Sequence, residues 1–257
     1  NQAEIIVVND GSVDNTSDIC KANNIMEIVH PFSMGNGAAI KAGARAATGK
    51  IIVFMDADGQ HKPEDISRLL EALDKNYDMV VGARSSESQA SVGRSIANRF
   101  YNWLSSKMVN HKVEDLTSGF RVVRREKFME FINLLPNAFS YPTTITMAFF
   151  RAGYAVKYIP IVAEKRIGKS HIKIIRDGFR FVLIIFKIGT LYSPLKLFLP
   201  ISLMLFFTGV AYYLYTFITA GRFTNMSATI LSSSLLVFLI GLVSEQITSL
   251  IYQNKDK

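Results

Sequence analysis

The chain has 257 residues, of which 49% are hydrophobic, 19% are charged and one, Cys20, is cysteine, and its formal net charge is +8. This apolar content excludes a disordered chain, and a single cysteine excludes a domain held together by internal disulfides. The positive excess lies in residues 94–187, with 17 Lys or Arg against 6 Asp or Glu, directly before the most apolar part of the chain, so we expect an anionic membrane rather than nucleic acid as the partner.

The first residues of the chain already belong to a predicted strand. Asn1 is not an initiator methionine, and Glu4–Asn9 already has the composition of a buried strand. We expect that an N-terminal piece of the first domain, including its first strand, is missing from the sequence.

Predicted strands and helices alternate up to about residue 160. Short apolar, β-branched runs predict buried strands at Ile5–Val8, Ile51–Met55 and Met79–Val81. Alanine-rich sequence and apolar residues at helical spacing predict helices at Ala38–Ala47 and Pro63–Asp74. This order predicts an α/β domain over residues 1–170 with a mostly parallel sheet, whose ligands bind at the carboxyl ends of the strands.

Residues 171–194 join this domain to the apolar end of the chain. In Lys173–Leu191, Arg176, Arg180 and Lys187 fall on one helical face, and phenylalanine and leucine residues fall on another. This pattern predicts an amphipathic helix in the plane of the lipid headgroups. An ordinary packed helix with a solvated side is the alternative.

Residues 195–257 have the pattern of a membrane hairpin. Lys196 and Arg222 enclose 25 uncharged residues, and Arg222 and Glu245 enclose 22 more, enough to cross ~30 Å of hydrocarbon. We predict two transmembrane helices at about 197–221 and 226–250, because a pair of buried core helices would need a larger domain around it. The segments on the outer sides of the two helices carry more lysine than the turn between them. Positive charge is enriched on the cytoplasmic side of membranes, so this predicts a multi-pass protein with its N-terminal domain and C-terminus in the cytoplasm.

Polar residues follow the strand predicted at Ile51–Met55. If the chain turns at Asp56-Ala57-Asp58, both carboxylates can reach one Mg²⁺ or Mn²⁺, with Gln60 supplying another oxygen. Solvated turn residues are the alternative for so short a motif. A second segment, Gly35-Asn36-Gly37-Ala38-Ala39, leads from a loop into the alanine-rich helix. It could bind phosphate at the helix start, but we favour a helix entry with small residues for close packing.

Six segments carry a resemblance to a known family: VVNDGSVDNT, GNGAAIKAGARAATG, VFMDADGQHKPEDI, VVGARS, TSGFRVVRREKF and RIGKS. In this order they resemble the family-2 glycosyltransferases of GT-A fold over about residues 4–173. More narrowly, they are similar to the dolichol-phosphate mannosyltransferase and bacterial polyprenyl-phosphate glycosyltransferase branch. The resemblance implies a Rossmann-like catalytic domain that transfers a sugar from a UDP- or GDP-sugar to a polyprenyl phosphate, using Mg²⁺ or Mn²⁺. Direct displacement by the phosphate oxygen of the acceptor would invert the anomeric carbon, which is a hypothesis from the chemistry of the acceptor.

The resemblance also implies roles for individual residues. Val8 and Asp10 match the strand end that holds the nucleoside. Asp56, Ala57 and Asp58 match the D-x-D motif that receives the donor diphosphate, with Asp56, Asp58 and Gln60 as metal ligands.

Further basic and acidic residues match later motifs. Arg84 matches an arginine near the phosphates, and Arg166 and Lys169 match a basic loop that closes over them. Asp115 and the segment Thr117–Arg121 fall where the family's sugar pocket lies. The residues expected to act in catalysis are Asp56, Asp58, Arg84 and Asp115.

The sequence departs from the family pattern in several places. The P-x-Y-N-E-like segment is absent, Asn9 stands where a second aspartate is common, and Ser140–Thr144 lacks the glutamate of mannosyltransferase-like members. The sugar, the nucleotide base, the polyprenol and the oligomeric state therefore stay open. The Q-x-x-R-W motif of processive synthases is also absent, which favours a single transfer. A sugar-nucleotide nucleotidyltransferase and a non-catalytic nucleotide-binding membrane anchor are the alternatives.

Overall fold

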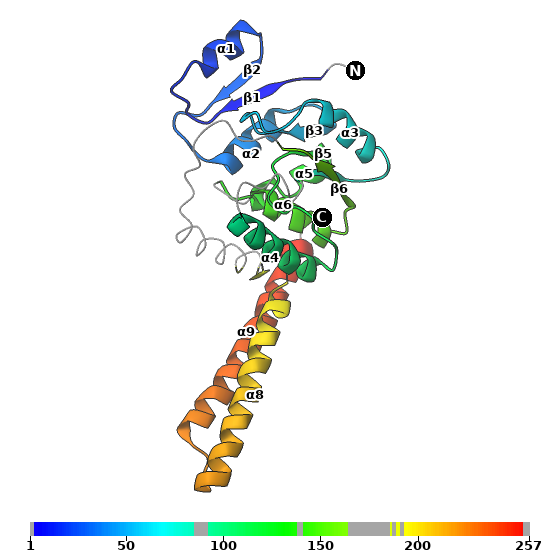
Figure 1. The fold of residues 1–257 in the computed structure, drawn as a ribbon. Helices are drawn as coiled ribbons and strands as arrows, with labels where there is room; N and C mark the ends of the chain where they lie inside the picture. Colours follow the sequence, from blue (N-terminus) through cyan, green and yellow to red (C-terminus); the bar gives the residue numbers. More distant parts are fainter. Residues whose placement is uncertain are drawn as a thin grey trace. The chain divides into compact units, whose positions relative to one another are not determined.

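The computed structural model describes residues 3–84, 92–137, 141–163, 186, 189–190 and 193–253 (Figure 1). The chain divides into two compact units, Asn1–His171 and Ile172–Lys257. Arg166, Lys169 and almost all of the predicted amphipathic stretch Lys173–Leu191 lie outside the described residues.

The described strands of the first unit form two sheets. β1 (Ile6–Asn9) and β2 (Met26–Val29) pair in parallel and are connected by α1 (Thr16–Ala22). The second sheet has the order β3-β5-β4-β6 and consists of β3 (Ile51–Phe54), β5 (Arg121–Arg124), β4 (Met79–Arg84) and β6 (Val156–Ile161). The predicted α/β class is confirmed.

Strand β5 is the antiparallel member of the second sheet. It lies between β3 and β4 and is antiparallel to both, whereas β4 and β6 are parallel. The sheet is therefore mostly parallel only in the sense that β3, β4 and β6 run in one direction. The sequence pattern gives no signal for β5, because an arginine at each end leaves only two apolar residues between them.

Helix α3 (Glu64–Leu73) covers the centre of this sheet. Its leucines Leu69 and Leu73 are fully buried and pack with Val80 of β4 and Val122 of β5. Burying a leucine side chain contributes roughly 1.5–3 kcal/mol, so this helix–sheet contact is a major part of the core. Glu64 and Asp65 occupy the first turn, where negative charge favours the positive end of the helix dipole.

The described part of the first unit contains four further helices and a 3₁₀ turn. Small buried residues let α2 (Asn36–Ala46) approach β1 closely: a Cβ on Gly43 would lie 3.2 Å from Val8 Cγ2. This contact lies in the body of α2 and shows that the helix packs closely on β1 there. The others are α4 (Val92–Val109), α5 (Arg125–Met129), the 3₁₀ turn η2 (Ile132–Leu134) and α6 (Tyr141–Arg151).

The second unit contains two long apolar helices, α8 (Pro194–Ala220) and α9 (Asn225–Gln253), close to the predicted boundaries. Both are long and apolar enough to cross a membrane. Many of their Leu, Phe and Ile side chains are exposed. An apolar surface of this kind suits lipid better than water.

Small and polar residues join α8 to α9. A Cβ on Gly209 would lie 2.8 Å from Leu231, and one on Gly241 would lie 2.8 Å from Phe198, so glycine permits the close approach. Ser202 and Ser234 each donate a hydrogen bond to the other's backbone carbonyl at 3.0 Å. Such small-residue contacts and hydrogen bonds are typical of helices packed within a membrane.

Glu245 of α9 contacts the first turn of α8. Its Oε2 accepts a hydrogen bond from the backbone N–H of Leu195 at 3.2 Å. The carboxylate therefore caps the N-terminal end of α8, where negative charge is favourable.

Candidate active site

The D-x-D motif leaves the sheet directly after β3. The chain turns there, with Gly59 at a positive φ of 74°, and Ala57 is exposed while Asp56 and Asp58 are half-buried. The Asp56 carboxylate lies against Gly119, since a Cβ on that glycine would be 2.7 Å from Asp56 Oδ2. The predicted turn is thus present, and Asp56 points toward the loop that precedes β5.

Arg84, at the end of β4, makes a two-pronged ion pair with Asp115. Arg84 Nε donates to Asp115 Oδ2 at 2.8 Å, and Nη2 donates to Oδ1 at 3.0 Å. The backbone amides of Thr117 and Ser118 also donate to Asp115 Oδ1, at 3.0 and 3.1 Å. Burial raises the pKa of Asp115, but these hydrogen bonds and the charge of Arg84 outweigh it and keep the pKa below its ordinary value.

Electrostatic interactions link this ion pair to the D-x-D motif. Burial lowers the pKa of Arg84, but the hydrogen bond and charge of Asp115 and the charges of Asp56 and Asp58 raise it overall. Three carboxylates thus act on one arginine: Asp115 binds Arg84 directly, and the charges of Asp56 and Asp58 act on it as well. The structure therefore brings together all four residues that were expected to act in catalysis.

His61 belongs to the same cluster and was not predicted as a site residue from the sequence. Its ring stacks on Phe120, with 4.9 Å between centroids and 26° between planes. Burial lowers the pKa of His61 despite the nearby charges of Asp56 and Asp58, which favours the neutral ring at neutral pH. Its buried Nδ1 makes no hydrogen bond within the described residues. Its position close behind the D-x-D motif was the only signal in the sequence.

A fully buried arginine supports the loop beside Asp56. Arg121 donates to the carbonyl of Pro142 and to Thr146 Oγ1, both at 3.2 Å, and to the carbonyl of Ser118. Tyr141, whose ring lies 5.6 Å from the guanidinium, donates its hydroxyl to the carbonyl of Gly119 at 3.2 Å. These contacts hold residues 118–121 in place, so the backbone next to Asp56 has little freedom to move.

Val8 and Asp10 lie at the end of β1, in the other sheet. Asp10 Oδ1 accepts hydrogen bonds from His30 Nδ1 at 2.7 Å and from the amide of Met34 at 2.9 Å. Oδ2 accepts from Ser33 Oγ and the amide of Gly35, both at 2.9 Å. Burial raises the pKa of Asp10, but these four hydrogen bonds lower it to about 2. Asp10 therefore organises the loop that leads into α2.

The oxygen donors of the D-x-D segment fit a hard divalent cation. Asp56, Asp58 and the side-chain oxygen of Gln60 are the ligand types that Mg²⁺ and Mn²⁺ prefer. In the described part of the chain, no group of three or more His, Cys, Asp or Glu residues is placed to hold a metal ion, and the D-x-D segment offers two carboxylates and one amide oxygen. Such a site suits a cation whose coordination is completed by the phosphates of a substrate.

Two family models match this chain. "Glycosyl transferase family 2" matches residues 1–132, and "GtrB C-terminal hairpin" matches residues 193–250. The family predicted from the six motifs is confirmed. The hairpin match, together with two apolar helices, supports the predicted association with a membrane.

Two curated relatives are similar over more than half of the chain. The polyprenol monophosphomannose synthase of Mycolicibacterium smegmatis is 30% identical over 186 residues, which cover 66% of this chain and 70% of the synthase. The undecaprenyl-phosphate 4-deoxy-4-formamido-L-arabinose transferase of Yersinia pestis is 32% identical over 156 residues, which cover 55% of this chain and 47% of the transferase. The chain thus spans about half the length of the second relative.

Solved structures share the fold at lower identity. Glucosyl-3-phosphoglycerate synthase from Mycobacterium tuberculosis, in complex with Mn²⁺ and UDP-glucose, superimposes with a TM-score of 0.54 and 20% identity, covering 72% of this chain and 66% of that chain. A second structure of this synthase, with phosphoglyceric acid, has a TM-score of 0.51 and 22% identity, covering 64% of this chain and 61% of that chain. At these identities the similarity concerns the fold alone.

Proposed function

Since the chain belongs to glycosyl transferase family 2, we propose that it moves one sugar from a nucleotide diphosphate sugar to a polyprenyl phosphate in the membrane. The observation that carries this proposal is that one chain combines the cluster around Asp56 and Asp58 with a GtrB-type hairpin. The names of the two curated relatives, a polyprenol monophosphomannose synthase and an undecaprenyl-phosphate sugar transferase, support the same class of acceptor.

Three oxygen-bearing side chains would hold the divalent cation: Asp56, Asp58 and Gln60. When bound, Mg²⁺ or Mn²⁺ would neutralise negative charge that develops on the departing diphosphate. Arg84 can add fixed positive charge to that of the cation, because its ion pair with Asp115 orients the guanidinium in advance. Arg166 and Lys169 are proposed to close over the same phosphates, and Val8 and Asp10 to border the nucleoside.

The acceptor determines which proton transfers the protein must perform. A phosphate monoester has a second pKa of ~6, by analogy with phosphoserine, so its oxygen is already an anion at neutral pH. This oxygen forms the new bond to the anomeric carbon, while the bond to the diphosphate breaks and its electron pair leaves with the diphosphate. No general base is needed, and attack from the opposite face inverts the anomeric centre.

We propose that the first unit and the C-terminus face the cytoplasm.

The proposal is tested with membranes that contain the full chain, radiolabelled UDP- or GDP-sugars, Mn²⁺ or Mg²⁺ and polyprenyl phosphate. We expect label in the organic phase, an equal amount of nucleoside diphosphate in the aqueous phase, and loss of both on chelation of the metal. Pyrophosphate release without labelled lipid would instead indicate a nucleotidyltransferase. Donor binding without any turnover, across all sugar nucleotides, would indicate a non-catalytic anchor.

Gly119→Ala should weaken the site without unfolding the domain. The new methyl group would meet the Asp56 carboxylate, which can shift because it ends a flexible side chain. We expect the affinity for Mn²⁺ to fall by about tenfold, as for other changes just outside a metal's ligands. Isothermal titration with donor present measures it. Gly49→Ala is the matched control, since its Cβ would make only an ordinary contact, 3.4 Å from the Ile51 carbonyl. Unchanged Mn²⁺ affinity in Gly119→Ala would contradict a metal ligand role for Asp56.

A further inference from the structure

The exposed face of α4 carries aromatic side chains that the core does not use. Phe100 is 52% exposed and Trp103 is 56% exposed, with 6.0 Å between their ring centroids. On the opposite face of the same helix, Tyr101 and Met108 are only 8% and 7% exposed. The helix therefore has its own buried side, and the two rings form a second apolar surface.

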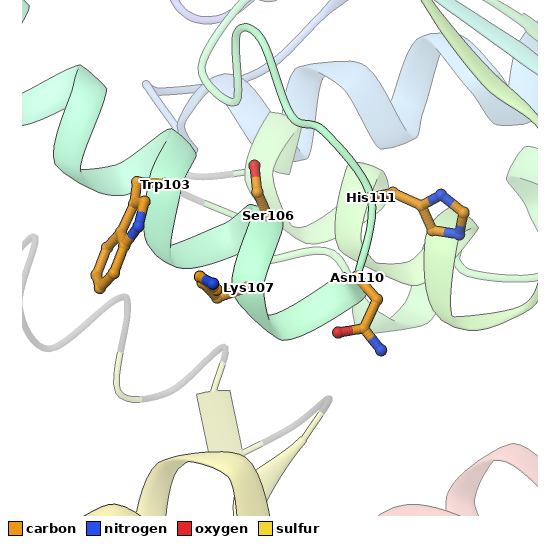
Figure 2. A pocket seen from close by; sticks show the side chains of 5 residues that line it. All are labelled: Trp103, Ser106, Lys107, Asn110 and His111. Carbon is orange, nitrogen blue, oxygen red and sulfur yellow. The ribbon is translucent and has the colours of Figure 1, made fainter.

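Basic and polar side chains continue this surface toward the end of the helix. Arg99 and Lys107 are exposed, one residue before Phe100 and one helical turn after Trp103. Figure 2 shows Trp103, Lys107 and Asn110 projecting on the same side of this segment. An open hollow there is lined by Trp103, Ser106, Lys107, Asn110 and His111. We call Arg99, Phe100, Trp103 and Lys107 the α4 surface.

The charged residues of α4 itself are all basic, and the acidic residue that follows the segment, Glu114, pairs with Lys112 at 2.9 Å. Residues 88–113 contain Arg94, Arg99, Lys107 and Lys112 and no aspartate or glutamate. A protein partner or a second copy of this chain would need acidic groups that this segment itself does not supply. Anionic phospholipid headgroups supply them in a plane, and tryptophan is enriched at that depth because its ring is apolar and its N–H is polar.

We propose that the α4 surface inserts into the headgroup region of an anionic bilayer, as a membrane contact additional to the hairpin. Phe100 and Trp103 would enter the boundary between headgroups and acyl chains, and Arg99 and Lys107 would contact lipid phosphates. This inference depends on the association of the chain with a membrane and not on which sugar is transferred. Its consequence is that the first unit is held at the level where a lipid-linked phosphate is presented.

Trp103 is the only tryptophan in the chain, so intrinsic fluorescence reports on this surface alone. The full chain is placed in nanodiscs of phosphatidylcholine and phosphatidylglycerol, with and without acyl chains brominated near the headgroup. We expect brominated lipid to quench most of the emission, and aqueous iodide to quench it less than in the urea-unfolded protein. Emission that is insensitive to brominated lipid and fully open to iodide would overturn the proposal. So would quenching that changes with protein concentration, which indicates a second copy.

Matched charge changes test the electrostatic part. Arg99→Glu combined with Lys107→Glu should remove the quenching by brominated lipid. Lys21→Glu combined with Lys75→Glu changes the net charge equally at two other exposed sites and should keep it. Equal loss in both double variants would contradict a specific role of the α4 surface. Lipid-linked sugar measured in the same nanodiscs tests the proposed function separately, because the fluorescence measurement needs no donor.

Discussion

Replacing Asp58 with asparagine is expected to lower kcat for lipid-linked sugar formation by about 10³-fold, comparable to removing a charge-stabilising group from an active site. Asparagine has nearly the same shape but carries no negative charge, so the variant should keep its fold and lose affinity for the divalent cation. The rate is measured as organic-phase label at saturating donor, with the Mn²⁺ concentration varied so that weaker binding and slower turnover are distinguished.

Two comparisons make this measurement specific. Asp74→Asn removes a carboxylate at the exposed end of α3 and should leave kcat unchanged. Asp56→Asn should resemble Asp58→Asn, because both side chains interact with Arg84 in the same cluster. If Asp58→Asn turns over at the wild-type rate at saturating Mn²⁺, the assignment of the metal site to the D-x-D motif is wrong.

The second large effect is on stability and concerns the ion pair of Arg84 with Asp115. We expect Arg84→Ala to lower the free energy of unfolding by about 3 kcal/mol, at the low end for breaking a buried pair. The Asp115 side chain is only 7% exposed and would lose its charged partner, while Arg84 is 28% exposed, which moderates the loss. Urea unfolding of the full chain in detergent, followed by near-ultraviolet circular dichroism, measures the change.

The partner substitution and pH distinguish a lost charge pair from lost packing. Asp115→Asn combined with Arg84→Ala should recover part of the stability, because no charge then remains buried without a partner. The pKa of Asp115 is lowered in the folded state, so its contribution is complete above the unfolded pKa of ~3.9 and is lost as the pH falls through the lower folded value. If the loss of unfolding free energy in Arg84→Ala does not depend on pH in this acidic range, the electrostatic explanation is contradicted.

Local pattern predicted the parts of the site that lie close together in the chain. Asp56 and Asp58 follow an apolar run, and such a run ends where a parallel strand presents its ligand-binding edge, so their position could be inferred without coordinates. Arg84 could be assigned from its resemblance to a family motif, and it too stands at the end of a strand. The two apolar helices were predicted nearly to their ends, because uninterrupted hydrophobic length is a strong signal.

Contacts between distant segments were not predictable in this way. Gly119 lies against Asp56, and Arg121 is buried beneath the same loop, although both come more than 60 residues after Asp56. An arginine in a sequence suggests a surface or a ligand site, and nothing local indicates that carbonyl groups and a tyrosine ring will surround it. His61 was overlooked because its burial depends on Phe120, which only the tertiary structure brings near.

The position of β5 between β3 and β4 has a consequence for how the first unit folds during synthesis. When residues 51–84 have left the ribosome, β3 and β4 have no strand in common, because the pairings that connect them run through Arg121–Arg124. The four-stranded sheet can therefore not nucleate as a local hairpin, and it must close loops of more than 30 residues before its pairings stabilise it. The edges of β3 and β4 that pair with β5 therefore stay without their partner strand until residues 121–124 emerge, which happens before the first residue of the apolar helical hairpin is translated.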